Sequence, residues 1–169
     1  MTSNPGAAAD TVTPAHFEEG RPMTLAGLRE HYTPTSLDGI PALWQRLVAF
    51  GRLPGRVGRI DYAAVFLQPD GCDYLAGFEV ADAAGLPEAF TCVNIPSRQY
   101  AVFCHHGHVA TLRNTFDAIL SLWLPASGLQ MAHTADGAVY VLERYGEGFD
   151  PRSGTGDIQL WVPVTDIHT

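Results

Sequence analysis

The chain contains no lysine, and its basic side chains are ten arginines set against 18 acidic residues. The formal net charge is therefore −8. Neither a basic stripe nor a run that mixes basic and aromatic residues is present, so we predict no direct contact with nucleic acid. An acidic surface serves solubility in most proteins, and it also tolerates or mildly attracts cationic ligands.

Cysteines and long apolar runs are also scarce. The three cysteines are Cys72, Cys92 and Cys104, an odd number without a C-x-x-C pair, which argues against a disulfide framework and fits a reducing compartment. No secretory signal opens the sequence, and no apolar run approaches the ~18 residues of a membrane-spanning helix. We therefore predict a cytoplasmic protein without a membrane partner.

Familiar catalytic and metal-binding motifs are missing as well. The sequence has no G-x-S-x-G, H-E-x-x-H, P-loop or dinucleotide-binding glycine pattern. Cys104-His105-His106-Gly107-His108 matches no common zinc spacing, and no second cluster of cysteine and histidine accompanies it. We predict neither a metal nor a cofactor, and we expect these histidines to be buried or surface groups without a metal.

A repeated motif is the strongest signal that is present. Ile40-Pro41-Ala42-Leu43-Trp44 and Ile119-Leu120-Ser121-Leu122-Trp123 share the pattern I-x-x-L-W, 79 positions apart. Each copy lies in a helical pattern that follows one strand-like segment and precedes two more. The predicted fold is α+β: a duplicated βαββ module with pseudo-twofold symmetry, antiparallel sheets and two long helices flanking a central ligand groove.

The length of 169 residues and a hydrophobic content of 46% suit one compact domain. We predict a disordered tail at 1–20 and a single domain at 21–169, with halves at about 23–82 and 89–165. One helix follows a candidate N-cap at Ser36, and the other spans about 109–124. The predicted strands are 23–32, 61–67, 73–81, 90–95, 100–106, 139–145 and 158–164.

The clearest hairpin is joined by Pro69-Asp70-Gly71, because proline presets its φ and glycine accepts a left-handed conformation. A three-residue loop pairs Phe66 with Tyr74 and Tyr62 with Phe78. Side chains alternate along a strand, so we expect these four aromatic residues on one sheet face.

Glu143 is the strongest single candidate for a ligand-binding residue. It shares a strand face with Val139, Val141 and Tyr145, so an inward orientation buries a carboxylate among apolar groups. A cationic or hydrogen-bonding ligand would supply its partner, whereas a solvated strand end or pairing with an arginine is the structural alternative.

Two further features bear on a binding site. Glu79 points away from Tyr74 by alternation, which favours a structural or edge role. Trp44 and Trp123 occupy equivalent positions in the two predicted helices, where tryptophan most often packs in the core. Aromatic rings beside a carboxylate favour a binding cavity, because rings offer apolar area and attract cations.

In combination, a set of motifs resembles GyrI-like small-molecule-binding proteins, also described as AraC-type effector-binding domains. In the second half these motifs are Tyr100-Ala101-Val102-Phe103, His106-Gly107, Trp123-Leu124-Pro125, Ser127-Gly128, Glu143-Arg144-Tyr145, Phe149-Asp150-Pro151 and 158–163. In the first half they are Gly27-Leu28, 40–44, Tyr74-Leu75-Ala76-Gly77 and Glu79-Val80. The resemblance covers about residues 23–164.

The resemblance implies a pocket between two halves, in which aromatics around a buried glutamate bind apolar and often cationic compounds. Glu143 matches that glutamate by its place in the motif. With only about 20 residues before the module, we expect a stand-alone member without a helix-turn-helix. The predicted ligand-binding residues are Glu143, Trp123, Tyr62, Phe66, Tyr74, Phe78, Trp44, Tyr145 and Trp161.

Three functions remain open at this stage. The first is a multidrug-type binding protein for a small hydrophobic or cationic organic ligand. The second is a hydrolase of strained, cyclopropane-type natural products, in which Glu143 and Tyr145 act on water or substrate. The third is an inhibitor-like protein that binds a macromolecular partner. The ligand and the oligomeric state stay open.

Overall fold

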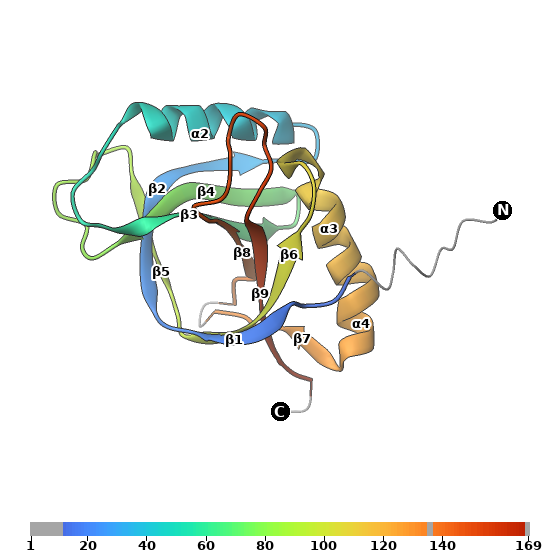
Figure 1. Ribbon diagram of the computed structural model, residues 1–169. Helices are drawn as coiled ribbons and strands as arrows, with labels where there is room; N and C mark the ends of the chain where they lie inside the picture. The colour runs from blue at the N-terminus through green and yellow to red at the C-terminus, as the bar shows by residue number, and fades with distance from the viewer. Residues whose placement is uncertain (1–11, 135–136, 168–169) are drawn as a thin grey trace.

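The computed structural model describes residues 12–134 and 137–167, which form one antiparallel sheet and two helical segments (Figure 1). The strands are β1 (His16–Gly20), β2 (Met23–Tyr32), β3 (Arg56–Gln68), β4 (Gly71–Val80), β5 (Thr91–Ile95), β6 (Arg98–His105), β7 (Leu129–Met131), β8 (Tyr140–Tyr145) and β9 (Ile158–Asp166). None of the helices in this part of the chain is long and apolar enough to span a bilayer.

The sheet order is β1-β6-β9-β8-β3-β4-β2-β5, and β7 pairs beside β9. The two halves therefore have mirrored orders, β2-β4-β3 and β6-β9-β8, and they meet where β3 pairs with β8. The predicted α+β architecture of antiparallel strands and two helices is confirmed. The origin of the halves by duplication of one sequence unit stays a prediction.

The sheet curves because two bent segments contribute to both of its ends. β1 runs into β2, and β5 runs into β6, yet β1 pairs with β6 while β2 pairs with β5. Figure 1 shows the resulting curved sheet, with both helices outside the curve. Its inner face is concave, and its outer face is covered by the helices.

Strand β1 corrects part of the predicted disordered tail. Residues 16–20 pair with β6, with Glu18 opposite Tyr100, whereas residues 1–11 lie outside the described residues. The side chains from His16 to Glu19 are exposed, so the strand has no apolar face for a sequence pattern to reveal. Backbone pairing along β6 holds it instead, together with a ring contact between Phe17 and Trp123 at 6.3 Å.

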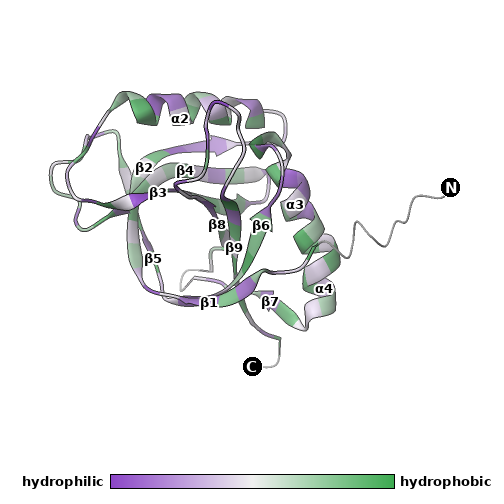
Figure 2. Cartoon of the chain, in the orientation of Figure 1, coloured by the Kyte–Doolittle hydropathy of each residue, from purple (hydrophilic) through white to green (hydrophobic). Residues whose placement is uncertain are grey.

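The helices cover the outer face in the two halves. The short turn η1 (Leu37–Gly39) precedes α2 (Ile40–Ala49), whose apolar stripe buries Leu43 and Leu47. Ser36 does not cap this helix, contrary to the prediction, because its Oγ accepts from the Thr33 N–H at 2.8 Å. Figure 2 shows apolar residues along the central strands and alternating polar and apolar residues along α2.

The second helical segment extends from 109 to 127 without a break. It consists of η2 (Val109–Thr111), α3 (Leu112–Ala118), the π-helical turn η3 (Ile119–Trp123) and α4 (Leu124–Ser127). Gly128, at φ 78°, ends it in the left-handed conformation that favours glycine. The predicted helix at about 109–124 is confirmed, although Pro125 does not stop it and the segment continues to Ser127.

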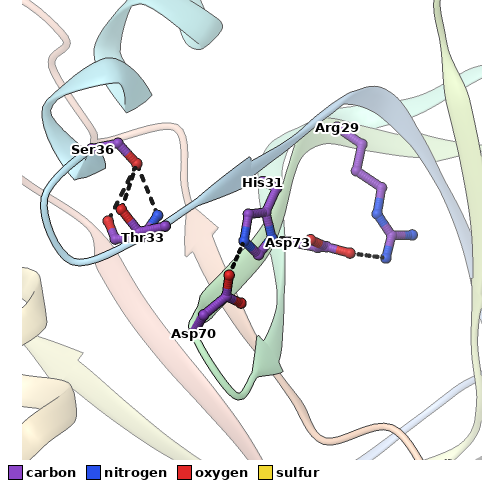
Figure 3. Close-up of polar contacts among 6 residues, drawn as sticks. All are labelled: Arg29, His31, Thr33, Ser36, Asp70 and Asp73. Carbon is purple, nitrogen blue, oxygen red and sulfur yellow. Dashed lines mark hydrogen bonds and ion pairs between the residues drawn. The ribbon is translucent and has the colours of Figure 1, made fainter.

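The β3–β4 hairpin has a shorter loop than predicted. Gln68 pairs with Gly71, which leaves Pro69 and Asp70 as the loop residues. Gly71 is required by close contact and not by a left-handed φ, since an added Cβ would lie 1.9 Å from the Tyr32 carbonyl oxygen. His31 at the end of β2 reinforces the turn, because its ring binds Asp73 at 2.7 Å and Asp70 at 3.2 Å (Figure 3).

Candidate functional site

Glu143 lies in the middle of the sheet, where β8 pairs with β3 on one side and β9 on the other. Its neighbours in the ladder are Ala63 and Leu160. Its side chain is on the helix-covered face and is partly buried, together with Val141 and Tyr145. Strand alternation therefore predicted correctly that Val141 and Tyr145 share its face, whereas the sequence left the inward orientation open.

Two tyrosines hold one oxygen of this carboxylate. The Tyr145 hydroxyl donates to Glu143 Oε1 at 2.6 Å, and the Tyr74 hydroxyl donates to the same oxygen at 2.7 Å. Trp44 Nε1 from α2 donates to the Tyr74 oxygen at 3.0 Å. We call these four residues, Glu143, Tyr74, Tyr145 and Trp44, the Glu143 cluster.

The rings of the cluster pack edge to face. Trp44 lies 5.5 Å from Tyr145 at 75° and 6.4 Å from Tyr74 at 81°, measured between ring centroids and planes. Phe149, from the loop between β8 and β9, contacts Tyr145 at 5.0 Å. Trp44 and Val65 pack against the apolar clusters of both halves, so the Glu143 cluster lies where the halves meet.

The electrostatics of the cluster favour a partner for Glu143. Burial raises the pKa of its carboxyl, and the hydrogen bonds from Tyr145 and Tyr74 oppose that rise. Burial and the nearby carboxylate raise the pKa of both tyrosines well above the usual value, so their hydroxyls stay protonated donors.

The second carboxylate oxygen, Oε2, is the open position of the cluster. Within residues 12–134 and 137–167, Oε2 takes part in no hydrogen bond and no arginine or histidine forms an ion pair with Glu143. This oxygen can accept a hydrogen bond from a ligand or lie beside a positively charged ligand group. The predicted alternative of pairing with an arginine is therefore wrong for the described chain.

Two other predicted residues share the outer face but lie apart from Glu143. Phe78 packs beside Phe90, at 6.3 Å between ring centroids, and beneath the Arg56 guanidinium at 4.6 Å. Trp123 packs on Phe103 at 5.0 Å. Trp44 and Trp123 thus have different surroundings, although they occupy equivalent places in the repeated motif.

Tyr62, Phe66 and Trp161 lie on the opposite, concave face. The predicted pairing of Phe66 with Tyr74 and of Tyr62 with Phe78 is wrong, because the two-residue loop shifts the register by one position. Phe66 pairs with Asp73, and Tyr62 pairs with Gly77. A shift of one residue moves a strand's side chains to the other face, so the four aromatics divide into two pairs.

The remaining candidates have structural partners. Glu79 is bound by Arg21 through two hydrogen bonds of 2.5 and 2.6 Å, in keeping with its predicted structural role. His105 is buried and binds Thr115 Oγ1 at 2.7 Å and the His108 carbonyl at 2.9 Å. No group of three or more potential metal ligands gathers in the described part of the chain.

Sequence reasoning missed Phe149 as a neighbour of the cluster and Trp44 as a hydrogen-bond donor to Tyr74. The Phe149-Asp150-Pro151 motif contributed to the family resemblance, but the sequence did not indicate where Phe149 lies in the fold. The Trp44–Tyr74 bond joins α2 to β4 across 30 positions of sequence. No local pattern encodes such a contact.

Comparison with known proteins gives one family and several relatives. The family model described as Cass2, integron-associated effector binding protein, matches residues 17–164. The transcriptional regulator BrlR of Pseudomonas aeruginosa is 30% identical over 153 residues, covering 89% of this chain and 55% of the regulator. The chain thus spans about half the length of that curated relative.

Solved structures share the fold. SAV2435 bound to tetraphenylphosphonium has a TM-score of 0.70 at 18% identity, with 89% of this chain and 93% of that chain covered. The Vibrio cholerae integron cassette protein VCH_CASS2 has a TM-score of 0.59 at 16% identity, with coverages of 89% and 95%.

Proposed function

Because the chain belongs to the Cass2 family of integron-associated effector-binding proteins, we propose that it binds lipophilic organic cations at the Glu143 cluster. One observation carries this proposal. Glu143 presents a carboxylate oxygen without a protein partner in the described chain, beside three aromatic rings.

The physical reason is the cost of burying a charge. A partly buried carboxylate loses hydration, and two neutral tyrosine donors compensate only in part. A cationic ligand supplies the opposite charge, and ring faces attract cations through their quadrupoles. The net charge of −8 adds a weak long-range attraction for such ligands.

One structural neighbour supports the choice of a lipophilic cation as the ligand. Tetraphenylphosphonium, the compound bound by SAV2435, is a delocalised cation surrounded by phenyl rings. Such a compound matches one carboxylate among Trp44, Tyr74 and Tyr145. Phe78 and Trp123 flank the same face, so we assign them to the margins of the site, whereas Tyr62, Phe66 and Trp161 on the concave face lie outside it.

A hydrolase is the second candidate, and one observation favours it. Glu143 combines a raised pKa with two hydroxyl donors and one open oxygen, an arrangement that can orient a water molecule for general base chemistry. Conversion of a strained electrophile to its water adduct, lost in Glu143→Gln, would identify this activity.

The test compares tetraphenylphosphonium with the neutral triphenylphosphine oxide by isothermal titration calorimetry. Glu143→Gln keeps the shape and removes the charge, so we expect the affinity for the cation to fall at least about tenfold while the affinity for the neutral compound stays within about twofold. Glu147→Gln, at an exposed glutamate in the following loop, is the matched control and should leave both affinities unchanged. Equal losses for cation and neutral compound in Glu143→Gln would contradict the anchor role.

A further inference from the structure

The concave face of the sheet carries a hollow of about 280 Å³, on the side of the sheet opposite the Glu143 cluster. Side chains and backbone from six strands and the β1–β2 bend surround it. They belong to His16, Glu18, Gly20, Arg21, Met23, Tyr62, Tyr100, Leu142, Arg144, Gln159 and Trp161.

Strand alternation separates this hollow from the Glu143 cluster. Glu143 and Arg144 are consecutive on β8, so their side chains point to opposite faces of the sheet. In the ladder, Arg144 pairs with Tyr62 of β3 and with Gln159 of β9, which places all three on the concave face. The two faces of one strand therefore present opposite charges.

The two arginines at the hollow differ in their partners. Arg21 is matched by the nearly buried Glu79 through two short hydrogen bonds, so its charge is already compensated. Arg144 has a single long hydrogen bond, 3.4 Å from Nη1 to Gln159 Oε1, and its guanidinium lies 6.0 Å from the centre of the Trp161 ring. The described residues offer no carboxylate within 4.0 Å of Arg144.

The Gln159 oxygen that Arg144 contacts is already used by another donor. Trp161 Nε1 donates to it at 2.9 Å, which is a shorter bond than that from Arg144. Most of the guanidinium donors of Arg144 thus have no partner among the described residues and can bind a ligand, and a guanidinium binds carboxylate or sulfonate oxygens in pairs.

The walls of the hollow are aromatic. Trp161 and Tyr100 contact each other at 5.4 Å, and the Tyr100 hydroxyl is held by Tyr140 at 2.8 Å. The acidic Glu18 also lines the hollow, but its side chain is 46% exposed and pairs with His16 at 3.1 Å. The negative charge is therefore at the solvent-exposed rim, whereas Arg144 is partly buried.

We propose that this hollow is a second ligand site, which binds a small aromatic anion with its carboxylate or sulfonate on Arg144 and its ring against Tyr62 and Trp161. Its volume lies near the lower end of small-molecule sites, which restricts the ligand to about the size of naphthalene. The site is independent of the cation site proposed for Glu143.

The test measures binding of naphthalene sulfonate and of the neutral naphthalene methanol by calorimetry. We expect the anion to bind at least about tenfold more tightly, and Arg144→Gln to remove that advantage. Arg152→Gln, at an exposed arginine in the β8–β9 loop, is the matched control and should leave both affinities unchanged. Tyr62→Leu, which removes a wall and no charge, should weaken both compounds alike.

Saturation with tetraphenylphosphonium distinguishes the two sites. Unchanged affinity for naphthalene sulfonate supports a separate anion site, and competition overturns it. Equal affinity of the wild-type protein for the anion and for the neutral compound also overturns the proposal. This comparison uses the wild-type protein alone, so it does not depend on whether a variant folds. Failure of tetraphenylphosphonium to bind would refute only the cation site, because the anion comparison does not depend on it.

Discussion

Glu143 carries its charge at an energetic cost that two tyrosine hydroxyls offset only in part. Burial raises the pKa of the carboxyl above its unfolded value, so protonation favours the folded state. This contribution to stability is complete at pH values below the ordinary carboxyl range, and it is lost as the pH rises through the raised pKa. A protein that keeps such a residue gives up stability for a charged site.

Glu143→Gln should therefore be more stable than wild type at about pH 8, by about 2–4 °C in melting temperature, because glutamine keeps an acceptor for both tyrosines and removes the charge. The gain should shrink towards pH 4, where the wild-type carboxyl is protonated as well. Thermal melts followed by circular dichroism across this range measure the effect. A gain that is constant with pH, or one that Glu147→Gln reproduces, would show that the charge of Glu143 is not its cause.

At the scale of single elements, the β3–β4 hairpin shows which features a sequence reveals. Alternation and helical spacing predicted both helices and seven of the nine strands in the described residues, but neither β1 nor β7. The register of the hairpin depended instead on loop length, which Pro69-Asp70-Gly71 left ambiguous. Gly71 lies against the β2 backbone, a contact made by a distant strand that no local pattern encodes.

His31 stabilises the same hairpin through hydrogen bonds whose strength depends on pH. The hydrogen bond to Asp73 raises the pKa of His31 most, and the hydrogen bond to Asp70 contributes the next largest rise. The histidine in turn lowers the pKa of Asp73. Charged His31 stabilises the hairpin at pH values below the ordinary histidine range, and this contribution is lost as the pH rises through the raised pKa. Arg29 also donates to Asp73 at 3.0 Å, so Asp73 retains one partner at high pH (Figure 3).

His31→Gln should accordingly flatten the pH dependence of the melting temperature above about pH 6, with a loss of about 1–2 °C at pH 6 that fades at higher pH. The effect should be small and weaken in high salt, because the group is exposed. Differential scanning calorimetry in matched buffers can measure it. His106→Gln, at an exposed histidine, serves as the control. An identical profile for both variants would refute a stabilising role of charged His31.

At the scale of the whole molecule, the site depends on contacts between the halves. The resemblance to GyrI-like effector-binding domains, drawn from scattered motifs, is confirmed by the family match and by the fold. Of the predicted binding residues, the structure brings Trp44, Tyr74 and Tyr145 to Glu143, while one register shift moved Tyr62 and Phe66 to the concave face. The types of residue that form the candidate site were predictable from the sequence. Which of these residues lie together depends on the pairing of β3 with β8, which joins the two halves.

Closure of the sheet is a property of the whole molecule and rests on β1. This strand pairs with β6 over residues 16–20, although its side chains are mostly exposed, and His16, Glu18 and Gly20 line the concave hollow. Removal of residues 1–20 should lower the melting temperature by about 5–10 °C more than removal of residues 1–11, because β6 loses its partner and the hollow loses a wall.

The same pair of shortened proteins tests how closure relates to binding. Without β1, affinity for naphthalene sulfonate should fall sharply, whereas tetraphenylphosphonium should still bind at a temperature where the protein is folded, because no residue of the Glu143 cluster lies in β1. Calorimetric titrations at low temperature, with folding checked by circular dichroism, give both affinities. If the two shortened proteins melt together and bind both probes alike, β1 contributes neither to closure nor to the concave site, and the sheet must be held by β2 to β9 alone.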